Sequence, residues 1–450
     1  MTLAEEQIET FRGSMRGRVL TESDSGYDEA RQIWNGMFDK RPGLIARCVS
    51  AGDVIAAVNY ARDNNLLIAV RGGGHSFPGY SVCEGGMMID LSPMRSIRVD
   101  PESKTARAEP GVLWAEIDRE AEVFGLATPG GMISHTGIAG LTLGGGFGWL
   151  CRKHGLVVDN LLSCDVVLAD GRLVRASADE NADLFWGLRG GGGNFGIVTS
   201  FEYRLHDLGP ILGGMLAFPL PEATKVIPAY AALMEKAPDY FIAGCFILTT
   251  PDGHQAVGIA PAYLGNDMAE GERLIAPLKQ LGTLVMDAVG PMPYTQIQKL
   301  IDGAAVPHRR YYMRSNFIGE LSEAAATAMV EAYTSSPSPL SAFIIVPFGG
   351  AVARVPADAT AFYYRSAPYS MTLLGAWEDS AADEANIAWL RNGWDRLQPF
   401  LADGVYVNEL FDEGAERIKS AYGPTFGRLQ DLKRKYDPNN LFRMNQNIAP

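Results

Sequence analysis

The sequence lacks most of the features that mark secreted, membrane-embedded or disulfide-stabilised proteins. Its 450 residues include only five cysteines, an odd number, scattered without any C-x-x-C pair. Neither a disulfide framework nor a zinc or other metal site is therefore expected. No apolar run approaches the roughly 18 residues that a membrane-spanning helix needs. Residues 1–7 are acidic and no apolar stretch follows them, unlike a secretory signal peptide, so we expect a cytoplasmic protein.

Concentrated positive charge is also missing. The formal net charge is −13, and no dense run of Lys and Arg occurs. Nucleic acids and anionic membrane surfaces attract proteins through such charge, so neither partner is expected. A strand followed by G-x-G-x-x-G, a helix and a later acid is absent too, which disfavours a nicotinamide dehydrogenase. The composition is otherwise that of a globular protein, 47% hydrophobic and 20% charged, and long enough for two domains.

Glycine, by contrast, is abundant and unevenly distributed. The 50 glycines gather in four clusters, at residues 72–74, 130–131, 144–148 and 190–196. Because glycine has no Cβ, such clusters let several backbone segments approach a neighbour closely. A large cofactor is the simplest neighbour to require this.

The first cluster follows a short apolar strand at residues 66–70 and reads Arg71-Gly72-Gly73-Gly74-His75-Ser76. Successive backbone N–H groups in such a loop can converge on a pyrophosphate. Residues 44–70 form a predicted β-α-β unit, with Ser50 or Asp53 capping its helix, and deliver the loop at the carboxyl end of a strand, where α/β folds bind ligands. The alternative is a turn with an incidental histidine.

Two further stretches extend this pattern. Residues 128–150 are small, hydroxylated and nearly uncharged, which suits contact with a flat apolar ring system. A hairpin at 161–176, a helix at 183–189 and a strand at 197–201 surround the fourth cluster.

The composition changes near residue 208, where apolar and aromatic side chains become larger. The pattern from there predicts an antiparallel sheet with helices on one face. Its expected helices span residues 221–236, 268–281, 323–335 and 381–400, and its strands 241–248, 256–263, 343–347 and 370–377. The last thirty residues are again rich in turns and Asn.

Taken together, the motifs at residues 71–76, 144–148, 190–198 and 437–447 resemble the covalent-flavin oxidoreductases of the berberine bridge enzyme-like branch of the vanillyl-alcohol oxidase superfamily. The resemblance covers nearly the whole chain. It implies an α+β fold of two domains. A discontinuous FAD-binding domain of the PCMH type would comprise residues 1–207, with its core at about 40–207, and the returning segment 420–450. Residues 208–419 would form a substrate domain with an antiparallel β-sheet and flanking helices.

The resemblance also implies FAD attached covalently through His75 to the 8α-methyl group. A second link through cysteine is not expected, because Ile133 stands at the position where many relatives have that cysteine. Cys151 lies too far along the chain and is expected in the core. The residues expected to bind FAD are Arg71, Gly72, Gly73, Gly74, His75, Ser76, Tyr80, Pro129, Gly130, Gly131, Thr136, Gly137, Gly140, Gly144, Gly145, Gly146, Gly148, Asn194, Gly196, Ile197, Val198, Asn408, Asn445 and Asn447.

The candidate base is Glu409, which follows Tyr406-Val407-Asn408, a segment that carries a catalytic tyrosine in some relatives. Tyr311 and Tyr406 are expected to orient the substrate or share its proton, although Tyr311 fits a sheet core equally well. Glu409 could instead be a solvent-facing carboxylate. His135 is interpreted as a packing or hydrogen-bonding residue in preference to a catalytic one.

We therefore expect an FAD-dependent oxidase. It would transfer hydride from an alcohol or amine carbon of a small organic substrate (aromatic, heterocyclic or sugar) to flavin N5, with O₂ as acceptor and H₂O₂ as product. The alternatives are a dehydrogenase with another acceptor and a flavin-binding protein without turnover. A monomer or a homodimer is expected.

Overall fold

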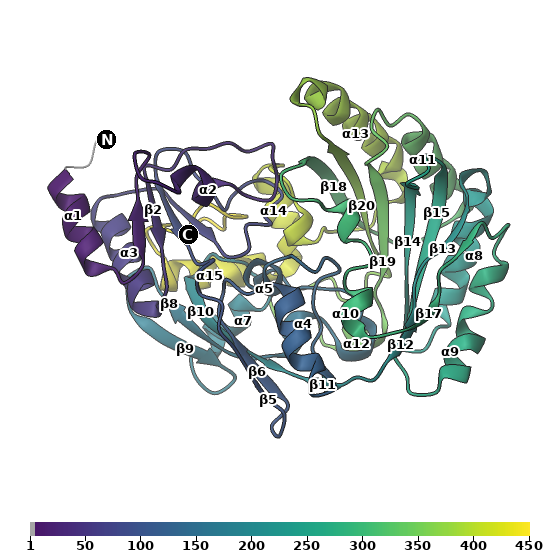
Figure 1. Cartoon of the computed structure of the whole chain (residues 1–450), viewed down its shortest axis with the longest axis horizontal. Coiled ribbons are helices and arrows are strands. Elements are labelled where there is room, and N and C mark those ends of the chain that lie inside the picture. The colour runs from purple at the N-terminus through teal and green to yellow at the C-terminus, as the bar shows by residue number, and fades with distance from the viewer. Residues whose placement is uncertain (1–4) are drawn as a thin grey trace.

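The computed structural model describes residues 5–450, so the first four residues of the acidic opening lie outside it. Helices and mainly antiparallel sheets are mixed, as predicted for an α+β protein. Figure 1 shows two parts side by side: a part with two small sheets, which also holds the C-terminal helices, and a part built on one large sheet. Between residues 5 and 450, no helix combines the length and apolar character needed to cross a bilayer.

The first small sheet has the strand order β1-β2-β4-β3, with β2 and β3 both parallel to β4. Ser50 caps the intervening helix α3 by accepting a hydrogen bond from the Asp53 N–H. The predicted β-α-β unit is present, but its two strands do not pair, because β4 lies between them. The elements are β1 (Arg18–Leu20), α2 (Tyr27–Arg31), β2 (Leu44–Arg47), α3 (Ala51–Asp63), β3 (Ile68–Arg71) and β4 (Met87–Asp90).

The second small sheet is antiparallel, with the order β5-β6-β10-β8-β9. It contains the predicted hairpin, and helix α7 precedes the last glycine cluster as expected. The elements are β5 (Ile97–Asp100), β6 (Thr105–Ala108), α4 (Trp114–Glu122), α5 (Ile138–Leu143), α6 (Cys151–His154), β8 (Leu161–Val167), β9 (Leu173–Ser177), α7 (Ala182–Leu188) and β10 (Ile197–Arg204). Cys151 is fully buried, as predicted.

The large sheet has nine strands, of which seven follow the antiparallel order β16-β13-β15-β14-β19-β20-β18. The predicted strands and helices recur within a few residues. Strand β18 was not predicted, because its polar residues (Arg, Ser and Asn among the tyrosines) do not give the apolar pattern expected of a buried strand. The strands are β12 (Ile211–Gly213), β13 (Leu216–Pro219), β14 (Phe241–Thr249), β15 (Gln255–Tyr263), β16 (Met286–Asp287), β17 (Gly290–Met292), β18 (Arg310–Ile318), β19 (Ala342–Pro347) and β20 (Tyr369–Trp377).

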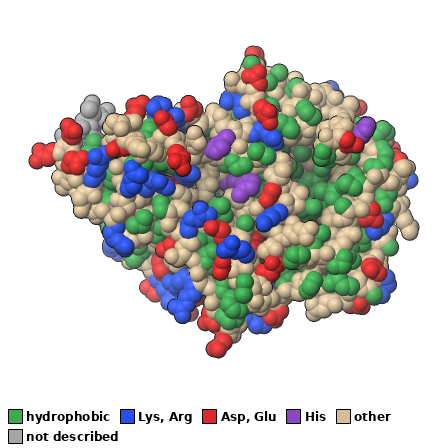
Figure 2. Space-filling view, in the orientation of Figure 1, with side chains coloured by type: hydrophobic (Ala, Val, Ile, Leu, Met, Phe, Trp, Pro, Cys, Tyr) green, Lys and Arg blue, Asp and Glu red, His purple; other side chains and the backbone are tan. Residues whose placement is uncertain are grey.

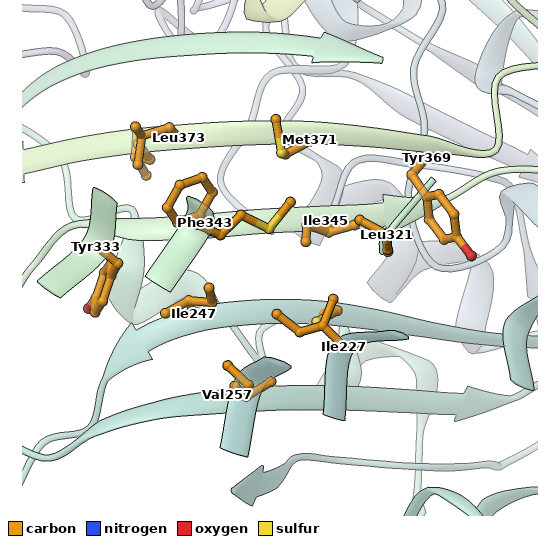
Figure 3. Close-up of a cluster of buried hydrophobic side chains, with 14 of the residues drawn as sticks. Ile227, Ile247, Val257, Leu321, Tyr333, Phe343, Ile345, Tyr369, Met371 and Leu373 are labelled. Carbon is orange, nitrogen blue, oxygen red and sulfur yellow. The ribbon is translucent and has the colours of Figure 1, made fainter. Parts of the chain in front are cut away.

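Helices cover one face of this sheet and leave the other for a site. Figure 3 shows Phe343, Met371 and Leu373 of the sheet packing toward Ile227 of α8 and Tyr333 of α11. Because side chains alternate along a strand, the residues between them face the first part of the molecule. The helices are α8 (Ala223–Glu235), α9 (Met268–Ile275), α10 (Tyr294–Ile297), α11 (Glu323–Thr334), α12 (Gly350–Arg354) and α13 (Asp383–Leu397).

The C-terminal segment contains two helices, α14 (Ala415–Tyr422) and α15 (Phe426–Tyr436), where the sequence suggested only turns. In Figure 1 the yellow α15 runs among the blue elements of the first part. The fully buried Lys433 fixes it there, donating hydrogen bonds to the carbonyls of Asn194 (2.9 Å) and Phe442 (2.8 Å) and to the Asp437 carboxylate (2.7 Å). The boundaries at 207 and 419 remain predictions.

Candidate active site

A cavity of about 380 Å³ lies between the glycine-rich loops of the first part and the uncovered face of the large sheet. Figure 2 shows histidine side chains near the middle of the molecule's face, and acidic and basic side chains intermingled around them. Most of the predicted site residues line this cavity. They are Gly72, Gly73, Gly74, His75, Ser76, Tyr80, Thr136, Gly137, Gly140, Asn194, Gly196, Ile197, Val198, Tyr406, Asn408, Glu409 and Asn445.

Two loops of this wall cross at a pair of glycines. A Cβ added to Gly73 would lie 2.5 Å from the Gly137 Cα, and one added to Gly137 would lie 2.5 Å from the Gly73 nitrogen. Neither position can carry a side chain while the loops stay together. Gly140 and Gly193 differ, since a Cβ there would meet no described atom within 4 Å. These two line the cavity and leave room for a ligand.

Other predicted cofactor-binding residues do not line the cavity. Gly130 packs under the Trp114 ring, Gly144 against the Asn408 side chain, and Gly148 against the Gly130 carbonyl, so protein packing already explains these glycines. Arg71 donates a 2.6 Å hydrogen bond to the Ala30 carbonyl. The full set outside the lining is Arg71, Pro129, Gly130, Gly131, Gly144, Gly145, Gly146, Gly148 and Asn447.

His75 is held in an aromatic stack. Its ring lies on Trp34, with 4.2 Å between centroids, and Trp34 also stacks on Tyr311 at 3.9 Å. Tyr311 is fully buried, does not line the cavity, and donates its hydroxyl to the Val306 carbonyl at 2.8 Å. Because its hydroxyl is already used within the core, the position of Tyr311 favours the sheet-core alternative, and a role in handling a substrate proton stays a prediction. Trp34 itself was missed, since nothing in its local sequence links it to the glycine loop.

His75 is also paired with His135. The Nε2 of His75 lies 3.2 Å from the Nδ1 of His135, which makes His135 the hydrogen-bonding histidine favoured by the sequence. Burial and, secondarily, the neighbouring His135 lower the pKa of His75 to about 3. Burial also lowers the pKa of His135. Both rings are neutral at physiological pH, and His75 keeps a nucleophilic lone pair.

Glu409 lies at the end of a short 3₁₀ helix, Val407–Glu409, and faces the same cavity. Its Oε2 accepts hydrogen bonds from the hydroxyls of Ser315 (2.7 Å) and Thr372 (2.8 Å) and a longer one from Ser370 (3.4 Å). Burial raises the pKa of Glu409, and these hydroxyls oppose that rise. Ser315 and Ser370 were missed by the sequence analysis, because only the pairing of distant strands brings them to Glu409.

Tyr406 presents an oriented hydroxyl beside Glu409. Its oxygen accepts hydrogen bonds from the Gly146 N–H (3.0 Å) and the Asn408 side-chain amide (2.7 Å). With its lone pairs occupied, the hydroxyl proton is free to be donated into the cavity. Burial raises the pKa of Tyr406, so its hydroxyl stays protonated at neutral pH and is able to donate a hydrogen bond.

The cavity wall contains polar atoms that need a partner. Ser81 Oγ, Asn445 Oδ1 and Gln446 Oε1 are buried without a hydrogen bond to any of residues 5–450, and all three residues line the cavity. Such groups usually have partners, so a large polar ligand fits this wall. No cluster of three or more potential ligands among residues 5–450 could hold a metal ion.

Comparison with known proteins identifies that ligand class. Residues 42–177 match the family model of the FAD binding domain, and residues 405–449 match that of berberine and berberine-like proteins. An FAD-linked oxidoreductase of Dictyostelium discoideum is 33% identical over 99% of this chain and 98% of its own. The chain belongs to the berberine bridge enzyme-like FAD-linked oxidoreductases. This enzyme is also 33% identical to (R)-6-hydroxynicotine oxidase of Paenarthrobacter nicotinovorans, over 97% of each chain.

Solved structures show the same fold. The enzyme resembles 6-hydroxy-D-nicotine oxidase from Arthrobacter nicotinovorans with a TM-score of 0.90 and 32% identity, covering 100% of both chains. Berberine bridge enzyme in complex with (S)-reticuline gives a TM-score of 0.89 at 22% identity over 99% of each chain, which supports the fold alone. The two-part architecture of Figure 1 is thus the FAD-binding fold expected from the sequence.

Proposed function

We propose that this enzyme is an FAD-dependent oxidase of a small hydrophobic amine or alcohol, with Glu409 as the base. The observation that carries the proposal is a buried carboxylate, in the cavity that also contains His75, with no Lys or Arg among the lining residues of the described chain, 5–450. Oxidation removes a hydride from carbon and a proton from the attached nitrogen or oxygen. Two electrons and two protons then convert O₂ to H₂O₂.

FAD would be held by the glycine loop around Gly72–Gly74 and by the cavity-facing groups of Gly193, Asn194 and Asn445. It supplies the hydride acceptor, chemistry that no side chain offers. We propose His75 as the covalent attachment point. Its neutral ring supports this, as does the contact of its Nε2 with His135, which fixes the orientation of the ring. Ile133 lines the cavity wall, and no cysteine among residues 5–450 does, so we propose no second link.

The protein's own groups would manage the substrate proton. Glu409 Oε1 makes no hydrogen bond to any described residue, because Oε2 takes all three hydroxyls. That oxygen can receive the proton from a substrate N–H or O–H. Tyr406 can donate its hydroxyl proton to hold the substrate heteroatom. Met313, Ile344 and Leu374 form an apolar wall that excludes water from the reaction.

The lining also favours a class of substrate. It contains no Lys or Arg among residues 5–450, so carboxylate and phosphate substrates would find no counter-charge. A sugar would bury hydroxyls against Met313, Ile344, Val346 and Leu374 without partners. A compact hydrophobic amine or alcohol avoids both costs. The oxidation of 6-hydroxynicotine by a relative 33% identical is consistent with this class.

A screen of oxygen uptake tests the proposal. Benzylic amines, benzylic alcohols, the matching carboxylates and short oligosaccharides would be supplied to the purified enzyme, with H₂O₂ measured separately. We expect turnover with the amines or alcohols only. Reduction of an artificial dye without oxygen uptake would instead identify a dehydrogenase, and turnover confined to sugars would contradict the substrate class.

The attachment site has its own test. Replacing His75 by alanine should release all flavin into the supernatant on acid precipitation, whereas the wild type should keep its yellow pellet. His254→Ala is the matched control, since that side chain is 82% exposed and far from the glycine loops in sequence. A flavin peptide that maps to any residue other than His75 would contradict the attachment.

A further inference from the structure

Three hydroxyl groups around Glu409 form what we call the hydroxyl cluster, defined as Ser315, Ser370 and Thr372. Ser315 of β18 and Thr372 of β20 are direct cross-strand partners. Ser370 lies two residues before Thr372 on the same strand. Because side chains at this spacing share one face of a sheet, all three hydroxyls point toward Glu409. The register of two distant strands therefore builds the cluster.

The surroundings of the hydroxyl cluster are apolar. On the adjacent β19, Ile344 pairs with Thr372 and Val346 pairs with Ser370, and both also line the cavity. On such an apolar face, Ser315, Ser370 and Thr372 would pack no better than alanine or valine at the same positions. Their positions are explained by the carboxylate oxygen that all three hydroxyls contact.

Within the part of the chain that the structure describes, no Lys or Arg lines the cavity to stabilise that carboxylate. The titratable side chains on the cavity wall, besides Glu409, are His75, Tyr80, Tyr406 and Tyr422, and none is positively charged at neutral pH. Hydrogen bonds from hydroxyls are thus the main favourable interaction of the ionised form. They also leave Oε1 free, since every one of them ends on Oε2.

The cluster can also accommodate the protonated form. Ser315 Oγ lies 3.2 Å from the Met371 carbonyl, and Thr372 Oγ1 lies 3.2 Å from Ser315 Oγ. When Glu409 is neutral, Ser315 can turn its proton to Met371 and Thr372 can donate to Ser315. Both protonation states are therefore satisfied without movement of heavy atoms.

We propose that Ser315, Ser370 and Thr372 are positioning residues that keep Glu409 ionised and direct its Oε1 to the substrate. The inference rests on the proposed role of Glu409 as the base. Beyond that role, we infer that strands β18 and β20 of the large sheet set both the basicity of Glu409 and the orientation of its carboxylate. Removing a hydroxyl should disfavour the charged form and raise the pH at which Glu409 ionises.

The direct test is a pH titration of the holoenzyme by difference infrared spectroscopy. The C=O stretch of protonated Glu409 is assigned as the band that Glu409→Gln removes. Thr372→Val and Ser315→Ala should each move its midpoint upward by about one to two pH units, the effect of losing a hydrogen bond to a charged group. Ser370→Ala should move it less, because its contact is longer at 3.4 Å.

Two controls separate a hydroxyl effect from general damage. Thr372→Ser keeps the hydroxyl and should restore the midpoint, whereas a structural role of the threonine methyl would not be rescued. Thr327→Val removes a hydroxyl on the exposed side of α11 that bonds only its own helix, and should change nothing. Flavin content and unfolding temperature show whether each variant is folded. If Thr372→Val does not fold, the shift of the Glu409 midpoint in Ser315→Ala tests the inference alone.

A second measurement distinguishes failure of the inference from failure of the proposed function. The acid limb of flavin reduction, measured with the best substrate from the oxygen-uptake screen, should shift with the infrared midpoint. If the flavin of Glu409→Gln were reduced by substrate at the wild-type rate, Glu409 would not be the base. A Glu409 band whose midpoint stays unmoved in Thr372→Val and Ser315→Ala would overturn the inference while leaving that role intact.

Discussion

At the scale of single residues, the site combines reactive groups with unusual protonation. Burial raises the pKa of the Glu409 carboxyl and lowers the pKa of the His75 imidazole to about 3. One group thus becomes a stronger base than an exposed glutamate, and the other stays neutral. Both shifts have the same origin, the transfer of an ionisable group away from water. Perturbed groups that share a cavity are typical of functional sites.

Replacing Glu409 by glutamine should slow flavin reduction on the order of 10²–10⁴-fold, because glutamine keeps the shape and removes the basic oxygen. Flavin content should not change, since Glu409 is separate from the proposed attachment at His75. Anaerobic stopped-flow reduction measures this. A rate within a few-fold of wild type would remove Glu409 from the mechanism and leave the substrate proton to solvent.

At the scale of elements, helix α15 holds the C-terminal segment to the last glycine cluster. Lys433 and Asp437 are both fully buried, and Asp437 also accepts the N–H groups of Leu441 (2.8 Å) and Phe442 (2.9 Å). The Asp-Pro-Asn-Asn-Leu-Phe sequence is thereby explained as a turn wrapped around one carboxylate. Lys433, the ion-pair partner of Asp437, also donates a hydrogen bond to the carbonyl of Asn194, a residue that lines the cavity.

We expect Lys433→Met to lower the free energy of unfolding by about 3–5 kcal/mol, because it leaves the buried Asp437 charge unpaired. Flavin incorporation should fall with it. Lys435→Met is the matched control: its ion pair with Asp183 is 58% exposed on the lysine side and should contribute less than about 1 kcal/mol. Denaturant unfolding of both variants makes the comparison. Equal losses of unfolding free energy in the two variants would show that the buried Lys433–Asp437 pair contributes no more to stability than the exposed pair.

The sequence predicts some of these elements and not others, for physical reasons. The loop from Gly72 to His75 was predictable because its conformational requirement is local. Glu409 could be proposed from its position after Tyr406. Strand β18 and the hydroxyl cluster could not, since their burial depends on pairing between strands far apart in the chain. Helix α15 was missed because its apolar positions, such as Leu429 and Leu432, are few among charged residues.

At the scale of the whole molecule, the contact between α4 and α10 joins the two parts in Figure 1. Gln298, just after α10, donates to the Gly131 carbonyl at 2.7 Å. Asp118 of α4 is 2% exposed, and neither of its carboxylate oxygens has a hydrogen-bond partner in the described chain. Burial, reinforced by Glu122 and partly opposed by the nearby Gln298 side chain, raises the pKa of Asp118 well above its usual value. An acid of this kind is stable at the joint only when protonated.

This arrangement gives stability a defined pH dependence. A carboxyl whose pKa is higher in the folded state than in the unfolded chain does not oppose folding below pH ~4. Its penalty grows as pH rises from there toward the folded-state pKa. We expect Asp118→Asn to unfold at a higher temperature than wild type at pH 8, with the difference shrinking at pH 5 and vanishing near pH 4. Thermal unfolding at these pH values measures it, and a difference independent of pH would refute the assignment.

The crossing of Gly73 and Gly137 has a consequence for protein engineering. Because both missing methyl groups would occupy the same gap, an alanine at either position forces the two loops apart. Once they have separated, the second alanine meets little further resistance. The pair should therefore show strong epistasis, with the double variant harmed about as much as either single one. Libraries that diversify one loop while keeping the other fixed would recover glycine at both positions, and the two loops are best redesigned as a single unit.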